Sequence, residues 1–130
     1  MRRILIVEDH VFFSGALELV LGRRIFEENG EPPAFRRAVT VAEGLGLVQE
    51  DGPFDLAIVD LMLPDGDGAD VVRKIKASNP ETRVAVLSSA LDLSGSLEAG
   101  ADEVIGKMED LQETVATLAR LASEGSGSAS

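Results

Sequence analysis

Three short runs of consecutive apolar residues limit what this chain can fold into. The runs cover residues 4–7, 56–59 and 84–87, and consist almost entirely of Val, Ile and Leu. An uninterrupted apolar run of this length is typical of a strand buried on both faces, as in a parallel sheet covered by helices. A shorter run at residues 104–105 and a weak edge pattern at residues 35–39 complete the set of expected strands.

Amphipathic segments lie between these strands. Their apolar residues recur at helical spacing: Phe13, Leu17, Val20, Leu21 and Ile25; Val41, Leu45 and Val48; Val71, Val72 and Ile75; and Leu111, Val115, Leu118 and Ala122. Alternating strands and helices imply right-handed crossovers and a sheet covered on both sides. We therefore expect an α/β fold with a doubly wound, five-stranded parallel sheet in the flavodoxin-like order 2-1-3-4-5. The Ser-Gly-Ser at residues 94–96 predicts that the fourth helix is short or irregular.

Charge and composition narrow the possible functions. The 130 residues carry 12 Lys and Arg against 23 Asp and Glu, a formal net charge of −11. A surface this acidic repels phosphate backbones and anionic lipid, so we expect no direct binding to nucleic acid or to a membrane. The chain has no Cys and one His, which excludes thiolate and His-rich metal sites. No apolar stretch is long enough for a signal peptide or a membrane span, and we expect a cytoplasmic protein.

The length predicts a single domain. We place it at residues 1–122. Residues 123–130 consist of Ser, Glu, Gly and Ala, a composition typical of a flexible linker or tail.

Carboxylates follow two of the predicted strands. Glu8 and Asp9 come directly after the first strand, and Asp60 follows the third. In the order 2-1-3-4-5 the first and third strands flank the point where the strand order reverses, which is where ligands bind in such sheets. Three acids brought together there would repel one another, and a hard divalent cation such as Mg²⁺ would remove the conflict.

Two further polar residues fall at the same sheet edge. Ser88 ends the strand at residues 84–87, and Lys107 follows the strand at residues 104–105. Each residue alone is more often a turn, a cap or solvated surface. A hydroxyl, an ammonium and a metal around one carboxylate together form a site for a phosphoryl group, with the carboxylate as nucleophile.

Four sequence motifs resemble the receiver domain of bacterial two-component response regulators, from Arg3 to about Ala122. They are VEDH at residues 7–10, DLMLPDGDG at 60–68, LSSA at 87–90 and GADEVIGK at 100–107. The resemblance implies that a sensor histidine kinase phosphorylates Asp60. It also implies that Mg²⁺ is bound by Asp9, Asp60 and the backbone carbonyl of Met62, with Glu8 acting through metal-bound water.

The remaining roles implied by the resemblance concern the phosphoryl group and the output. Lys107 would contact the phosphoryl group and Ser88 would hydrogen-bond to it. The start of the chain resembles the NarL/FixJ subgroup, whose members carry a helix-turn-helix output domain, and this implies transcription regulation. A homodimer is a further implied assembly. Val104 stands where such receivers normally have Tyr or Phe.

Alternative functions remain open at this stage. One is a stand-alone phosphorelay receiver without an output domain. Another is an Asp-nucleophile, Mg²⁺-dependent phosphatase of the haloacid dehalogenase kind, although that class has a D-x-D motif after the first strand and this chain has Glu8-Asp9-His10-Val11. A flavodoxin-like nucleotide binder is a third, disfavoured by the three acids. For a receiver we expect no enzymatic activity beyond its own phosphorylation and dephosphorylation, and we interpret His10 as an exposed loop residue.

Overall fold

The computed structural model describes residues 2–88, 99–107 and 110–125, and its main strands form a single parallel sheet. These strands are β1 (Arg3–Val7), β2 (Ala34–Ala38), β3 (Leu56–Asp60), β6 (Arg83–Ser88) and β7 (Glu103–Gly106). Their spatial order is β2-β1-β3-β6-β7, and every pairing is parallel. Counted along this sheet, that is the predicted order 2-1-3-4-5, so the fold prediction is confirmed.

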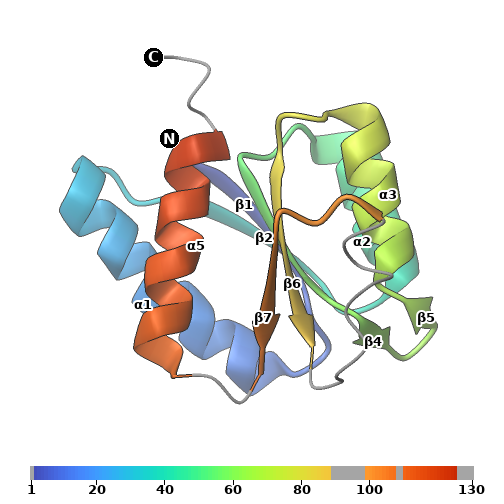
Figure 1. Cartoon of the computed structure of the whole chain (residues 1–130), viewed down its shortest axis with the longest axis horizontal. Coiled ribbons are helices and arrows are strands. Elements are labelled where there is room, and N and C mark those ends of the chain that lie inside the picture. Colours follow the sequence, from blue (N-terminus) through green and yellow to red (C-terminus); the bar gives the residue numbers. More distant parts are fainter. Residues whose placement is uncertain (1, 89–98, 108–109, 126–130) are drawn as a thin grey trace.

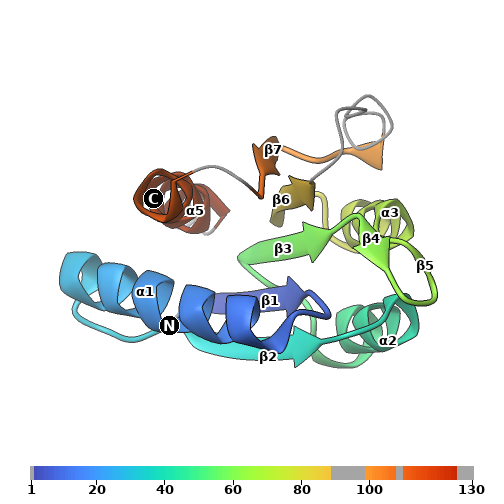
Figure 2. The same cartoon turned by 90° about the horizontal axis from the view of Figure 1, so that it is seen from below.

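Four helices of the described chain cover the sheet on both sides. They are α1 (Val11–Asn29), α2 (Val41–Asp51), α3 (Ala69–Ser78) and α5 (Leu111–Gly125). Figure 2 shows α1 and α5 on one face and α2 and α3 on the other. Each of the four helical patterns predicted from the sequence therefore lies in a helix.

The strand residues alternate between two cores, which explains why the apolar runs are uninterrupted. Leu5 and Val7 of β1 pack in the core beneath α2 and α3, whereas Ile4 and Ile6 pack in the core beneath α1 and α5. All four side chains have no exposed surface. Because successive residues of a strand point to opposite faces, only an all-apolar run fills both cores.

Three parts of the chain differ from the predicted pattern or lie outside the described residues. A small antiparallel hairpin, β4 (Met62–Leu63) with β5 (Gly66–Asp67), was not predicted and follows β3 directly. The last helix continues to Gly125, past the boundary placed at residue 122. The predicted fourth helix, including residues 94–96, lies outside the described residues. No helix of the described ranges combines the length and the apolar character needed to cross a lipid bilayer.

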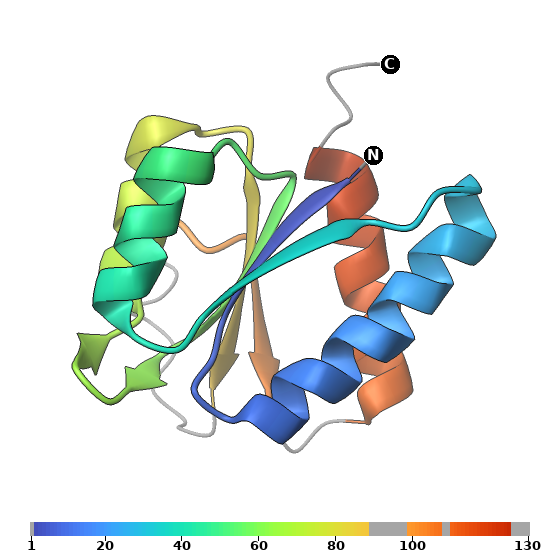
Figure 3. The same ribbon diagram turned by 180° about the vertical axis from the view of Figure 1, so that it is seen from behind.

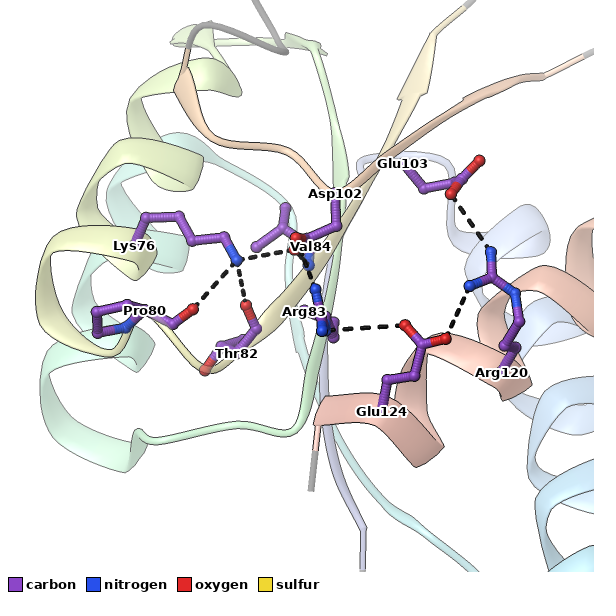
Figure 4. Close-up of polar contacts among 9 residues, drawn as sticks. All are labelled: Lys76, Pro80, Thr82, Arg83, Val84, Asp102, Glu103, Arg120 and Glu124. Atoms are coloured by element: carbon purple, nitrogen blue, oxygen red, sulfur yellow. Dashed lines mark hydrogen bonds and ion pairs between the residues drawn. The ribbon is translucent and has the colours of Figure 1, made fainter. Parts of the chain in front are cut away.

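A network of ion pairs joins α3 to α5 at the amino ends of β6 and β7 (Figure 4). The carboxylate of Asp102 accepts hydrogen bonds from Lys76 Nζ at 2.8 Å and from Arg83 Nη1 at 3.1 Å. Arg83 also lies 3.9 Å from Glu124 of α5, which in turn pairs with Arg120. The network therefore holds the strand edge opposite the one that carries the predicted site.

Candidate functional site

The carboxyl ends of the parallel strands place the predicted site residues at one edge of the sheet. Glu8 and Asp9 follow β1, Asp60 is the last residue of β3, Ser88 is the last residue of β6 and Lys107 directly follows β7. β1 pairs with β2 on one side and with β3 on the other, so the acids meet where the strand order reverses. In Figure 1 and Figure 3 this edge is at the bottom, where α1 begins and β6 and β7 end.

Three of these residues form a closely packed charged group. Lys107 Nζ lies 2.7 Å from Asp60 Oδ2 and 3.1 Å from Glu8 Oε2. Glu8 is 1% exposed and Asp60 is 2% exposed. The ammonium therefore bridges two almost fully buried carboxylates that come from different strands.

Burial and the neighbouring charges shift the pKa values of Glu8 and Lys107. Burial raises the pKa of Glu8, and the negative charge of Asp60 adds to that effect, while the His10 backbone N–H and Lys107 oppose it. Burial alone would lower the pKa of Lys107, but its hydrogen bonds to Asp60 and Glu8 and their negative charges outweigh burial and raise it. Lys107 is therefore a permanent cation at neutral pH.

Asp9 and His10 lie beside Glu8 and Asp60, and the four form a cluster of possible metal-ligating residues. One ligand atom from each of Glu8, Asp9, His10 and Asp60 lies within 4.8 Å of the others. Ligands of a single Mg²⁺ ion are at most about 4.2 Å apart, because Mg–O distances are about 2.1 Å. Small movements would thus let these atoms surround one cation.

Unsatisfied oxygens support the presence of a cation site. Asp9 Oδ1 is shielded from solvent and has no hydrogen-bond partner in the described part of the chain, with His10 Nδ1 3.6 Å away. Glu8 Oε2 is also buried and accepts no aligned hydrogen bond, although Lys107 Nζ forms the ion pair described above. Buried carboxylate oxygens of this kind are suited to a hard cation. The residues present therefore fit a divalent ion bound by oxygen.

The backbone around Asp60 is held by the hairpin that the sequence did not predict. Asp60 Oδ1 accepts a hydrogen bond from the Met62 backbone N–H at 3.1 Å, and the Gly68 N–H donates to Leu61 O at 2.9 Å. A Cβ added at Gly68 would lie 2.0 Å from the Asp60 carbonyl oxygen. Only glycine allows the returning strand to approach Asp60 this closely.

Ser88 is also placed at this edge. The residue is 4% exposed, and its backbone carbonyl accepts the Lys107 N–H at 3.0 Å. In the β3–β6 pairing Asp60 lies opposite Leu87, one position before Ser88. The structure thus places all the predicted residues at one edge of the sheet, while their chemical roles remain predictions.

Comparisons with known proteins identify the family. The family model described as the response regulator receiver domain matches residues 4–119. This chain belongs to the response regulator receiver domain family. Receivers of this family are signalling domains of two-component systems.

Individual relatives agree with this assignment. The chain is 36% identical over 126 residues to the response regulator protein PilR of Pseudomonas aeruginosa, an alignment that covers 92% of this chain and 26% of PilR. It spans 53% and 28% of the lengths of two further curated relatives.

Solved structures agree on the fold of the receiver. A CheY-like receiver domain protein from Methanospirillum hungatei has a TM-score of 0.79 and 27% identity, with 98% of each chain covered. A response regulator from Burkholderia pseudomallei, whose structure holds a phosphorylated aspartic acid, a calcium ion and citrate, has a TM-score of 0.76 and 25% identity. That match covers 100% of this chain and 74% of the other.

The receiver contains site contacts that sequence reasoning missed. The side chain of His10 is 71% exposed, as expected for a loop residue, yet its Nδ1 lies 3.2 Å from Glu8 Oε1. Lys107 Nζ lies 5.9 Å from the centre of the Phe13 ring. The acids after the first strand were visible in the sequence, but these contacts depend on the path of the chain into α1, which the sequence pattern does not specify.

Proposed function

We propose that Asp60 of this receiver accepts a phosphoryl group from a phosphohistidine of a sensor histidine kinase. The observation that carries the proposal is the buried Asp60 carboxylate at the sheet switch point, 2.7 Å from the ammonium of Lys107 and beside two further acids. A nucleophilic carboxylate next to a fixed cation is suited to receive a group whose oxygens are negatively charged.

The proposed transfer requires no other covalent chemistry. An Asp60 oxygen attacks the phosphorus of the donor, the new O–P bond forms as the P–N bond breaks, and the electron pair stays on the donor imidazole. Lys107 then stabilises the charge of the phosphoryl oxygens, and the Ser88 hydroxyl donates a hydrogen bond to one of them. Hydrolysis reverses the state: water attacks phosphorus, the bond to Asp60 breaks and phosphate leaves.

A divalent cation is part of this proposal. Asp9, Asp60 and the backbone carbonyl of Met62 would hold Mg²⁺, and Glu8 would act on it through water. When bound, Mg²⁺ neutralises charge on the transferring phosphoryl group. The unpartnered Oδ1 of Asp9, in the part of the chain that the structure describes, supports this ligand set.

The proposed output is transcription regulation by a DNA-binding domain joined to this receiver. Two observations support it: the chain spans only 26% of PilR, and its own charge of −11 disfavours DNA, so DNA affinity would reside in another segment. A gene whose reading frame stops just after this segment would contradict this output and favour a stand-alone relay.

Intact-mass spectrometry tests the phosphorylation directly. The protein is incubated with acetyl phosphate and Mg²⁺, and the expected result is the gain of a single phosphoryl group, lost when EDTA replaces Mg²⁺. Asp60→Asn should gain none. Asp70→Asn is the matched control, because Asp70 is an exposed acid at the start of α3 that pairs with Arg73, and it should gain mass as the wild type does. No gain by the wild type would refute the proposal.

A further inference from the structure

Asp65 joins the loop after Asp60 to the first turn of a different helix. The residue lies in the turn between β4 and β5. Its Oδ1 accepts a hydrogen bond from the Val41 N–H at 2.7 Å, and its Oδ2 accepts one from the Ala42 N–H at 3.1 Å. Both donors belong to the amino end of α2, so one carboxylate satisfies two backbone groups from a segment 23 and 24 positions away.

The next N–H group of α2, that of Glu43, is capped by the residue just before the helix. Thr40 Oγ1 accepts the Glu43 N–H at 3.1 Å, and Glu43 Oε1 accepts the Val39 N–H at 3.0 Å. This arrangement resembles a capping box, except that Glu43 accepts the N–H of Val39 and not that of the N-cap residue Thr40. It leaves the N–H groups of Val41 and Ala42 without a partner from the helix. Asp65 provides that partner, and the two hydrogen bonds hold the pKa of Asp65 below its usual value.

Apolar packing places the hairpin against the same helix end. Leu63 of β4 is buried in the core that contains Val41, the first residue of α2. A Cβ at Gly66 of β5 would lie 3.7 Å from Val41 Cγ2, an ordinary contact distance. The hairpin is therefore attached to α2 through packing and through the Asp65 carboxylate.

The other end of the hairpin holds the phosphoacceptor. Met62 donates its N–H to Asp60, and Gly68 closes the loop on the backbone of Leu61 and Asp60. Seven residues lie between Asp60 and Gly68, and among them Asp65 accepts hydrogen bonds from α2. Asp65 therefore lies three positions after Met62 in a short segment that is held both at Asp60 and at α2.

We propose that Asp65 is a positioning residue that fixes the Met62 backbone for the bound cation by anchoring the hairpin to the amino end of α2. The inference rests on the proposed function, because it assumes that Mg²⁺ is held beside Asp60 and Met62. Coupling between two sites is reciprocal, so cation binding strengthens the hydrogen bonds that Asp65 accepts from Val41 and Ala42.

Mg²⁺ titration by calorimetry compares Asp65→Ala with Thr40→Ala. Asp65→Ala should weaken Mg²⁺ binding about tenfold, the lower end of the range for groups that orient metal ligands. Thr40→Ala removes the other cap of α2 without touching the hairpin, so it should lower the unfolding midpoint and leave Mg²⁺ affinity unchanged. Asp65→Asn keeps an acceptor oxygen but loses the charge, and its affinity should fall between those of the wild type and Asp65→Ala.

Any of the following results would overturn the inference. Equal affinities of Asp65→Asn and Asp65→Ala would show that Asp65 acts only through its charge. Unchanged affinity in Asp65→Ala, or an equal loss in Thr40→Ala, would show that the hairpin needs no such anchor. Amide exchange of the wild type gives a test without mutation: Mg²⁺ should slow exchange at Val41 and Ala42, and no change at either amide would contradict the coupling. A wild type that binds no Mg²⁺ would refute the proposed function itself, and the inference with it.

Discussion

Replacing Lys107 with methionine should destabilise the protein strongly without a metal and weakly with one. The substitution keeps the apolar stem and removes the ammonium that lies 2.7 Å from Asp60 and 3.1 Å from Glu8. Removing one partner of a buried ion pair costs about 3–5 kcal/mol, because the other charge stays buried. The Lys107 side chain is 20% exposed, so water reaches the site and the lower end of the range, about 3 kcal/mol, applies.

The loss should depend on pH in a defined direction. The raised pKa of Lys107 means that its stabilising contribution is complete below its ordinary value of 10.5 and is lost only as pH rises through the folded value. The wild type therefore keeps this contribution between pH 5 and 8. In the variant, Glu8 and Asp60 repel each other, and protonation of Glu8, whose pKa burial already raises, relieves the repulsion as pH falls. The deficit should be largest at pH 8 and smaller at pH 5.

Urea unfolding in EDTA at both pH values measures this deficit. Mg²⁺ should reduce the deficit, because the variant lacks the competing Lys107 ammonium and should bind the cation more tightly than the wild type. A tenfold lower dissociation constant at saturating Mg²⁺ recovers about 1.4 kcal/mol of the difference. Equal unfolding midpoints for wild type and variant at pH 8 in EDTA would refute the reasoning, since it would mean that the two buried carboxylates need no cation.

Three further substitutions test other parts of the structure. Gly68→Ala places a Cβ 2.0 Å from the Asp60 carbonyl oxygen and should cost about 1–3 kcal/mol in urea unfolding and abolish phosphorylation, whereas Gly46→Ala in α2, where nothing lies within 4 Å, should do neither. Asp102→Asn should cost about 2 kcal/mol at pH 7 from lost charge-assisted hydrogen bonds. Burial alone would raise the pKa of Asp102, but hydrogen bonds from Lys76, the Val84 N–H and Arg83 outweigh burial and lower it. The contribution of Asp102 to stability is therefore complete above the ordinary pKa of 3.8 and is lost as pH falls through the folded value. In an acid titration, the difference in stability between wild type and variant should disappear in that range. Asp9→Ala should lose most Mg²⁺ affinity in calorimetry. In EDTA it should unfold at a slightly higher urea concentration than the wild type, because one of three mutually repelling carboxylates is removed.

The main sheet was predictable because burial on both faces leaves a mark in local sequence. The runs at residues 4–7, 56–59 and 84–87 became β1, β3 and β6, and the polar residues after them met at one edge because parallel strands share a direction. The hairpin within residues 60–68 was not predictable, since β4 and β5 have only two residues each and no alternation to detect.

Contacts between distant segments were not predictable in the same way. Asp65 and Asp102 both accept hydrogen bonds from residues far along the chain, and neither stands at a predicted strand end. Their partners depend on how α2 and α3 pack on the sheet, which is a tertiary property. The family motifs singled out Lys107 and Asp60, which the structure places 2.7 Å apart, while the roles implied for them stay predictions.

Mapping the phosphorylated residue tests the central claim most directly. After incubation with acetyl phosphate and Mg²⁺, borohydride reduction converts an aspartyl phosphate to homoserine, and peptide mass spectrometry locates that residue. The structure places one almost fully buried aspartate against the Lys107 ammonium, so the expected result is homoserine at position 60 in the wild type and nowhere in Asp60→Asn. Homoserine at Asp9 or at another acid, with Asp60 unmodified, would contradict the assignment of Asp60 as the phosphoacceptor.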